Sequence, residues 1–312
     1  MSFSIKAEAA VVKEKNFFLC ERLINMVVLC IMKTGLVLEG GGMRGMYTAG
    51  VIDILMENNV SVNIIIGVSA GAAFGCNFKS KQIGRVIRYN AAYCKNPHYA
   101  GFRSLLFTGD FYGAKFCYDD IPNKLDPFDT DTFNKSHEEF YAVCTDVLTG
   151  KAVYHKCETG SAEDIQWMRA SASMPLVSRI VRLDGMKLLD GGVADSIPLA
   201  KAEEFGCTKN IVVLTQMDGY TKKENPLMGA AKILYRKYPE FIKAMAHRHL
   251  MYNEELALVK EAEEKKKAFV FRPSRAVHIS RTERNPDNLR TLYALGREDA
   301  LNRLSELKEF LR

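Results

Sequence analysis

The sequence has no apolar run long enough to cross a membrane as a helix and no pair of cysteines in a C-x-x-C arrangement. A spanning helix needs roughly 20 mostly apolar residues, so none is expected. The eight cysteines are scattered, which argues against a zinc site or a disulfide framework and favours reduced thiols in the cytoplasm. With 47% hydrophobic residues among 312, the chain has enough apolar material for one large core.

The N-terminal segment 1–31 differs from the rest of the chain. Its apolar stretch, Leu23–Met32, is interrupted upstream by charged residues and is followed by no small-residue cleavage site, so a secretory signal is not expected. Two interpretations stay open: an amphipathic helix, or a poorly ordered extension ahead of the true start. We therefore expect a main domain over 32–220 and a second region over 221–312.

Residues 221–312 carry the whole positive excess of the chain, with 20 Lys and Arg against 13 Asp and Glu. We expect a mostly helical extension packed on the main domain, with Leu227–Lys267 forming two helices broken near Pro239. Its basic residues could contact an anionic membrane surface, although a solvated helix face is the commoner explanation. These residues are Lys232, Arg236, Lys237, Lys243 and Arg248.

A candidate nucleophile stands in Gly67-Val68-Ser69-Ala70-Gly71. The β-branched run Val62–Ile66 predicts a buried strand, and Ala70–Phe78 predicts the start of a helix. A serine on such a sharp strand-to-helix turn is held in strained geometry with its hydroxyl exposed, and Gly67 and Gly71 provide the room that the turn needs. The alternative is an ordinary turn in which Ser69 only caps the helix.

A glycine-rich loop, Gly40-Gly41-Gly42-Met43-Arg44-Gly45, precedes that turn. It connects a predicted strand, Thr34–Glu39, to a predicted helix, Tyr47–Asn58, so backbone N–H groups converge there on an anion. Gly40, Gly42 and Gly45 also fit the dinucleotide fingerprint G-x-G-x-x-G. That fingerprint expects an acidic residue at the end of the next strand, which is missing here. An oxyanion hole is therefore the better interpretation.

A candidate base follows much later, in Asp190-Gly191-Gly192. Met186–Leu189 predicts a hairpin strand after the turn Asp184-Gly185, and Gly191 and Gly192 allow a close approach to a neighbouring loop. Asp190 could instead be a turn residue. Asp195 is a competitor, although Ser196-Ile197-Pro198 suggests that it lies at a helix start.

In this order, the motifs resemble those of bacterial patatin-like phospholipases. The resemblance also rests on Arg169-Ala170-Ser171-Ala172-Ser173-Met174-Pro175 and on Leu189–Pro198, and it covers roughly Gly35 to Met217. It implies a three-layer α/β sandwich with a central, mostly parallel sheet. It also implies a Ser–Asp dyad in which Ser69 is the nucleophile and Asp190 the base, with oxyanion donors at Gly41, Gly42 and Met43.

The chemistry implied by the resemblance is consistent, because a serine hydroxyl becomes a good nucleophile only when a neighbour accepts its proton. An aspartate is a weak base, so most of the rate must come from stabilising the oxyanion. Arg44 adds positive charge for an oxyanion or a lipid phosphate, unless it is simply solvated. Histidines after the acid could complete a triad instead, but none carries a recognisable motif: His247, His249 and His278.

The segment Arg85–Phe128 is rich in aromatic and basic residues. It could form an acyl-binding wall or an interfacial contact, while packing of a helical insert over the core is the default interpretation. No RNA-binding motif accompanies it, so no nucleic acid is expected.

Together these features predict a lipid acyl hydrolase that cleaves carboxylic esters through an acyl-serine intermediate, with phospholipid or lysophospholipid as the leading substrate. We expect no metal or organic cofactor and a cytoplasmic protein that can contact anionic membrane peripherally. A non-lipid esterase or thioesterase, or a catalytically silent lipid- or protein-binding module, are the alternatives. No oligomeric state is predicted.

Overall fold

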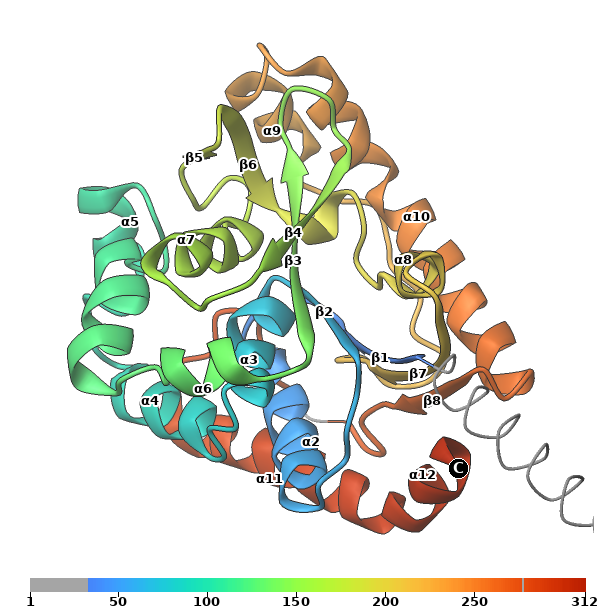
Figure 1. Ribbon diagram of the computed structural model, residues 1–312. Coiled ribbons are helices and arrows are strands. Elements are labelled where there is room, and N and C mark those ends of the chain that lie inside the picture. Colours follow the sequence, from blue (N-terminus) through green and yellow to red (C-terminus); the bar gives the residue numbers. More distant parts are fainter. Residues whose placement is uncertain (1–32, 277) are drawn as a thin grey trace, which may run out of the picture. The chain divides into compact units, whose positions relative to one another are not determined.

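The computed structural model describes residues 33–276 and 278–312, so the predicted extension 1–31 lies outside the described residues (Figure 1). In this part of the chain, eight strands form one sheet in the order β5-β6-β3-β2-β1-β7-β8, with β4 paired to β3. The strands are β1 (Lys33–Leu38), β2 (Ile64–Val68), β3 (Glu139–Asp146), β4 (Ala152–Cys157), β5 (Val181–Leu183), β6 (Met186–Asp190), β7 (Cys207–Val213) and β8 (Ala268–Phe271).

The pairs β1–β2, β2–β3 and β7–β8 are parallel, whereas β4 and β6 run antiparallel to β3. The β-branched residues of β2 favour a strand, and all five of its residues are buried, as expected for a strand covered on both faces. This strand lies two residues later than predicted. Immediately before the strand, the Asn63 side chain accepts a hydrogen bond from the Thr34 N–H at 2.7 Å.

Helices cover both faces of the sheet (Figure 1). Leu36, Leu38 and Ile65 pack in one core cluster, whereas Val37, Ile64 and Ile66 pack in another, as the alternation of a strand requires. Helices contributing to the first cluster include α2 (Met46–Glu57), α3 (Ala70–Lys79), α4 (Arg85–Tyr93), α7 (Ala162–Ser171), α11 (Pro286–Asn302) and α12 (Leu304–Leu311). The second cluster is covered by α8 (Leu199–Glu204) and α10 (Pro239–Glu264). The predicted three-layer α/β sandwich with a mostly parallel centre is confirmed.

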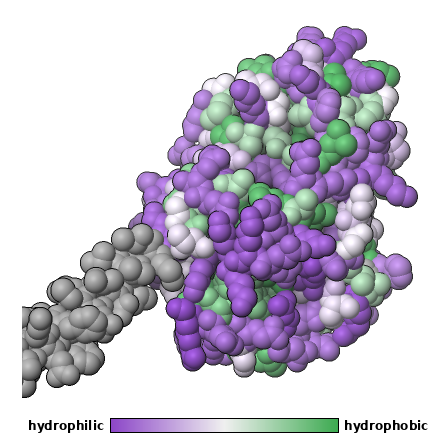
Figure 2. All heavy atoms as spheres, turned by 90° about the vertical axis from the view of Figure 1, so that its right-hand side faces the viewer, coloured by the Kyte–Doolittle hydropathy of each residue, from purple (hydrophilic) through white to green (hydrophobic). Residues whose placement is uncertain are grey.

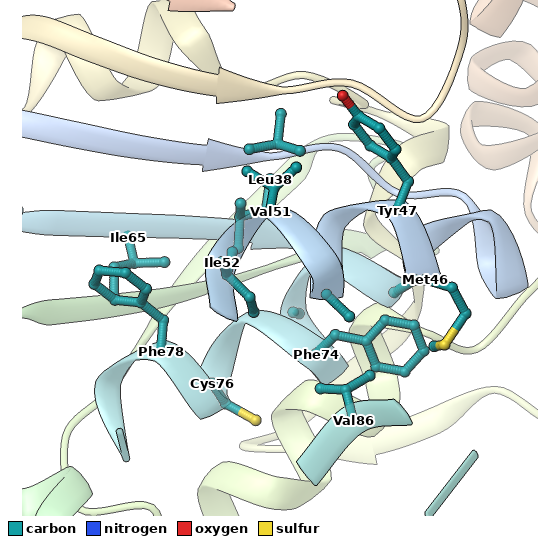
Figure 3. Close-up of a cluster of buried hydrophobic side chains, with 14 of the residues drawn as sticks. Leu38, Met46, Tyr47, Val51, Ile52, Ile65, Phe74, Cys76, Phe78 and Val86 are labelled. Carbon is teal, nitrogen blue, oxygen red and sulfur yellow. The ribbon is translucent and has the colours of Figure 1, made fainter. Parts of the chain in front are cut away.

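Figure 3 shows part of the first core, between β1, β2 and the helices α2, α3 and α4. Leu38, Ile52 and Phe78 are completely buried there. Burying one such side chain contributes about 1.5–3 kcal/mol. This packing holds β1 and β2 against α2 and α3, and therefore fixes the two turns in which the glycine loop and Ser69 stand.

Residues 221–312 form part of the same layers. As predicted, the helices α9 (Met228–Leu234) and α10 are separated near Pro239, which is the first residue of α10. Strand β8 extends the sheet beyond β7. Helix α11 packs closely on α2, since a Cβ at Gly50 would lie 2.1 Å from the Tyr293 carbonyl oxygen.

The outer face over α8 and α10 is largely hydrophilic (Figure 2). Several short helical elements complete the described part of the chain. The short elements are η1 (Gly42–Gly45), α5 (Phe102–Thr108), the π-helical η2 (Phe116–Leu125), α6 (Thr130–Lys135) and η3 (Gly191–Val193). Among the described residues, no helix combines the length and hydropathy needed to span a membrane.

Candidate active site

Ser69 stands between β2 and α3 in strained backbone geometry, with φ 54° and ψ −118°. Such a conformation costs a non-glycine residue about 1–3 kcal/mol. A Cβ at Gly71 would lie 2.3 Å from the Leu38 carbonyl oxygen, so the start of α3 can approach β1 only without a side chain there. The Ser69 N–H donates to the hydroxyl of Ser171, the last residue of α7, at 2.9 Å. This hydrogen bond links the turn at Ser69 to α7.

The Ser69 hydroxyl donates to Asp190 Oδ2 at 2.7 Å. Asp190 ends β6, after a hairpin whose turn residues Asp184 and Gly185 both have positive φ, as predicted for Asp-Gly. Its other oxygen, Oδ1, accepts the Gly192 N–H at 2.9 Å. The sheet and this loop therefore present one carboxylate oxygen to Ser69 and keep the second occupied.

The backbone around Asp190 is fixed by residues that the sequence did not single out for this role. The Asp190 N–H donates to the Ser173 carbonyl oxygen at 2.8 Å, and the Thr145 hydroxyl donates to the Asp190 carbonyl oxygen at 2.8 Å. Ser171 and Ser173 both belong to the motif Arg169–Pro175, which was the available signal. Nothing in the sequence around Thr145 indicated its contact.

None of the candidate histidines contacts Ser69 or Asp190 in the described part of the chain. His247 is exposed and hydrogen-bonds the Lys243 carbonyl oxygen, and His278 is also exposed. His249 differs from the predicted surface position because it lines a cavity that reaches Ser69. Its Nδ1 contacts the Ala246 carbonyl oxygen at 3.0 Å.

The glycine loop lies beside Ser69, and Gly42 has a φ of +58°. The Met43 N–H, predicted as an oxyanion donor, already donates to the Arg281 carbonyl oxygen at 3.0 Å. Among the described groups, the N–H groups of Gly41 and Gly42 have no acceptor. Of the three predicted oxyanion donors, the N–H groups of Gly41 and Gly42 are therefore the two that remain available. The remaining motif glycines, Gly40, Gly45, Gly67, Gly191 and Gly192, all lie against neighbouring chain segments.

Arg44 is partly buried on the wall of a cavity that also reaches Ser69. Burial, followed by the nearby Arg281 charge, lowers the pKa of Arg44. When the Gln216 amide oxygen faces Arg44, it accepts from both terminal guanidinium nitrogens, at 2.5 and 3.1 Å. The Arg44 Nε has no partner within the described residues.

An apolar cavity opens at Ser69. Its walls come from α3, α7 and the segment 85–128, which the sequence analysis considered as an acyl-binding wall. The Tyr112 hydroxyl donates to the Arg281 carbonyl oxygen at 3.0 Å, so this wall also contacts the C-terminal region. Large apolar residues of the lining include Phe74, Tyr89, Ile121, Phe128, Ile165 and Met168.

A second cavity, which we call the polar cavity, also reaches Ser69 and Asp190, and its lining is more polar than that of the first. Five cationic side chains line it: Arg44, Lys222, Lys223, Arg248 and Arg281. The two cavities share Gly42, Ser69 and Met174. The Ser69 hydroxyl therefore stands where an apolar space and a cationic space meet.

One face of α10 supports the loops of the site. Arg248 Nε donates to the Gly192 carbonyl oxygen, and the Tyr252 hydroxyl donates to Glu39 Oε1 at 2.6 Å. Arg248 is therefore not part of the membrane-facing helix face that the sequence analysis considered, because it points inward to the Asp190 loop and lines the cavity at Ser69. Arg248 and Tyr252 are four residues apart, which places them on one face of α10, and this spacing is the sequence signal that could have identified them.

Asp195 is not at a helix start, since α8 begins at Leu199 with Pro198 as its cap. Asp195 accepts a hydrogen bond from the Tyr154 hydroxyl at 2.5 Å and neighbours Glu255 of α10. Burial and then the Asp195 charge raise the pKa of Glu255, and burial raises that of Asp195. Asp195 Oδ1 has no donor among the described groups unless the two acids share a proton.

His155, Cys157 and Asp164 have ligand atoms within 4.8 Å of one another, the spacing of a metal site. Burial raises the pKa of the Cys157 thiol well above its usual value, which disfavours the thiolate that a metal requires. His155 stacks on Trp167 with ring centroids 3.9 Å apart, and Asp164 accepts the N–H groups of Thr159 and Gly160. The cluster is satisfied by protein contacts.

Two family profiles match the chain. Residues 36–202 match patatin-like phospholipases, and residues 238–312 match a domain of unknown function, DUF6363. The uncharacterized protein YjjU of Escherichia coli K12 is 26% identical over 280 residues, which cover 85% of this chain and 75% of that protein.

Other relatives match over a smaller part of their length. The patatin-like phospholipase domain-containing protein ZK370.4 of Caenorhabditis elegans is 29% identical, over 65% of this chain and 15% of its own. Lysophospholipase NTE1 of Coccidioides immitis is also 29% identical, over 57% of this chain and 11% of its own. Among solved structures, VipD from Legionella pneumophila aligns with a TM-score of 0.48 and 13% identity, over 88% of this chain and 67% of VipD.

Proposed function

The chain belongs to the patatin-like phospholipase family, and from this premise we propose that it hydrolyses lipid acyl esters through an acyl-serine intermediate. Membership of that family supports a lipid hydrolase. The proposal adds the residues: Ser69 as nucleophile, Asp190 as base, and the N–H groups of Gly41 and Gly42 as oxyanion donors.

The observation that carries the proposal is the 2.7 Å hydrogen bond from the Ser69 hydroxyl to Asp190 Oδ2. As the Ser69 oxygen attacks the ester carbonyl carbon, its proton passes to Asp190. The carbonyl oxygen becomes an oxyanion, which the Gly41 and Gly42 N–H groups stabilise; one such donor contributes about 3 kcal/mol. Collapse of this intermediate breaks the ester bond, and Asp190 returns the proton to the departing alkoxide.

Deacylation repeats these steps with water. Asp190 accepts a proton from the water molecule that attacks the acyl-serine carbonyl, and the same oxyanion donors act again. The collapse releases the fatty acid and returns the proton to Ser69. Asp190 serves both halves because its other oxygen is held by the Gly192 N–H at 2.9 Å, which keeps the carboxylate from rotating away.

The apolar cavity suits the acyl chain. Its lining is dominated by aromatic and aliphatic side chains, and it begins at Ser69. Burial raises the pKa of Tyr99 and Tyr118 well above the usual value, so their hydroxyls stay neutral beside the chain. The apolar lining therefore suits the acyl part of an ester, which favours lipid esters over small polar esters.

Ser69→Ala tests the proposal. The variant removes one hydroxyl, so we expect it to fold while losing ester hydrolysis and labelling by a fluorophosphonate probe. Asp190 then loses its hydroxyl partner only. A panel of lysophospholipids, neutral glycerides and acyl thioesters measured with the wild-type protein separates the lipid hydrolase from an esterase or thioesterase. If the wild-type protein neither hydrolyses these substrates nor reacts with the probe, the proposal fails and a binding module is the better assignment.

A further inference from the structure

The polar cavity at Ser69 contains a cationic cluster, defined here as Arg44, Lys222, Arg248 and Arg281. Its members come from distant parts of the chain: the glycine loop, the segment after β7, helix α10 and the segment before α11. Only Arg44 lies within the region that matches patatin-like phospholipases. In the described part of the chain, none of the four forms an ion pair with a carboxylate.

The acids near the cluster are already engaged or lie at its edge. Glu39 accepts the Tyr252 hydroxyl and the Thr215 N–H and hydroxyl. Asp190 accepts from Ser69 and Gly192. Glu224 is largely exposed. Since five basic residues line the cavity and only two acidic ones, Asp190 and Glu224, do so, the positive charge of the lining exceeds its negative charge.

Lys222 shows the strongest effect of this crowding. Its ammonium lies over the Tyr252 ring, 3.9 Å from the centroid, in a partly buried position. Burial, followed by the charges of Arg248 and Arg281, lowers the pKa of Lys222 to about 7. Keeping a lysine under such conditions costs stability, which is typical of residues retained for a ligand.

We propose that this cationic cluster binds the phosphate of the substrate headgroup and makes the enzyme selective for acyl esters with a net anionic headgroup. The inference rests on the proposed hydrolase function, because the cluster faces the same Ser69. The acyl chain then occupies the apolar cavity while the phosphate occupies the polar one. An ester linkage between them lies at Ser69, where the two cavities meet.

The matching experiment compares three lysolipids with one acyl chain, in detergent micelles at a fixed mole fraction. Lysophosphatidylglycerol carries one negative charge that does not titrate near neutral pH, lysophosphatidylcholine is zwitterionic, and monoacylglycerol is neutral. We expect kcat/KM to be highest for the anionic lipid. Lys222→Met and Arg281→Gln should each lower that value about tenfold or more, the size of one lost charge-assisted hydrogen bond. The value for monoacylglycerol should stay within about twofold.

Lys260→Met is the control, because this exposed lysine lies on α10 outside the cavity. It should change none of the three values. Equal losses for all three lipids in Lys222→Met would overturn the proposal and assign Lys222 to general structure. An unchanged preference in both cavity variants would overturn it as well.

The pH profile gives a second readout. Since the ammonium of Lys222 must be charged to bind phosphate, the anionic-to-neutral ratio of kcat/KM should fall as pH rises through about 7. The groups facing Lys222 are Arg44, Glu39, Arg248, Tyr252 and Arg281, with Glu224 and His249 also on the cavity wall. Lys222→Met should remove this decline. A decline that persists in the variant contradicts the proposal.

Thermal unfolding separates this inference from the hydrolase function, since it needs no turnover. Inorganic phosphate should raise the Tm of Ser69→Ala relative to chloride at equal ionic strength, and Lys222→Met should abolish that rise. Without phosphate, Lys222→Met should unfold at a higher temperature than the parent protein. A phosphate-dependent rise without any headgroup preference would overturn the substrate assignment and leave a site for free phosphate. If no ester is cleaved but the rise depends on Lys222, the hydrolase proposal fails and the anion site stands.

Discussion

The apolar and the cationic cavities meet at the same serine but are stabilised in opposite ways. The apolar wall is rich in aromatic rings, and two of its tyrosine hydroxyls are hydrogen-bonded: Tyr112 to the Arg281 carbonyl oxygen and Tyr99 to Asn90 Oδ1. The cationic wall holds Lys222 and Arg248 under conditions that lower the pKa of both. The first wall therefore adds to the stability of the fold, whereas the second lowers it in exchange for affinity toward an anion.

The two walls also differ in where they come from. The apolar lining lies within the residues that match the patatin-like family, whereas three of the four cluster residues follow them in the chain. Arg248 and Arg281 belong to the stretch that matches a domain of unknown function. In this chain, that stretch contributes to the site by completing its polar side.

The largest effect is expected from a change at Asp190, because every ester needs the same base, whichever headgroup occupies the polar cavity. Asp190→Asn keeps the side-chain shape but loses the base, so turnover should fall about 10²- to 10⁴-fold for every ester, whatever its headgroup. His247→Gln and His278→Gln are the controls, since both histidines are exposed and neither lines a cavity that reaches Ser69. Initial rates on one lysolipid and one neutral ester measure the loss.

Normal turnover in a folded Asp190→Asn protein would contradict the Ser–Asp assignment. A loss of several orders of magnitude in a histidine variant would instead indicate a triad, with Asp190 as an orienting acid. The acidic limb of the pH profile should also survive both histidine changes.

The sequence predicted the parts of the site that short motifs carry. The turn at Ser69, the hairpin before Asp190 and the layered fold follow from local periodicity and glycine positions. The contacts of Lys222, Arg248 and Arg281 could not be predicted, because they depend on how α10 and the segment before α11 pack on loops far away in the chain. For the same reason, the sequence could not predict that the Met43 N–H donates to the Arg281 carbonyl oxygen and is therefore not a free oxyanion donor.

Asp195 shows how a local pattern can mislead. The string Ser196-Ile197-Pro198 looks like the start of a helix, yet the Ser196 and Ile197 N–H groups donate to Glu255 of α10. A tertiary contact thus replaced the local cap that the sequence indicated.

The next largest effect concerns the surface beside the cationic cavity. Helix α9 follows Leu227 of the cavity lining and exposes Ile233 and Leu234, while Lys232 is also exposed. We expect this basic and apolar face to contact anionic membrane. Neutralising Lys232, Arg236 and Lys237 with Gln should weaken binding to anionic vesicles about 100-fold, at ~1 kcal/mol per charge.

Vesicle co-sedimentation at low and high salt measures this contact, since salt should weaken the wild-type binding as well. The matched control neutralises Lys135, Lys260 and Lys308, which are exposed elsewhere. Equal losses in both triple variants would mean that only net charge matters. Activity on micellar monoacylglycerol should be unchanged in either protein.

A smaller effect is expected from filling the apolar wall. Ala73 lines that cavity one turn after Ser69. Ala73→Leu should displace about two methylenes of a long acyl chain, which lowers kcat/KM for long-chain esters about tenfold at ~0.8 kcal/mol per methylene. Short-chain esters and the headgroup preference should be unaffected, and Ala92→Leu on the exposed side of α4 is the control. An equal loss at all chain lengths would place the acyl chain elsewhere.

The smallest effect concerns the stability of the charged side. Because burial and then Asp195 raise the pKa of Glu255 above the unfolded value, its contribution is fully present below the unfolded pKa. That contribution is lost as pH rises through the raised folded pKa.

Glu255→Gln can still accept the Ser196 and Ile197 N–H groups but cannot ionise. Urea unfolding at several pH values should therefore show the wild-type free energy of unfolding falling more steeply with rising pH than that of the variant. At alkaline pH the variant should be more stable by on the order of 1 kcal/mol. Glu254→Gln, an exposed neighbour on α10, should follow the wild-type curve. Parallel wild-type and Glu255→Gln curves would show that the two acids do not share a proton.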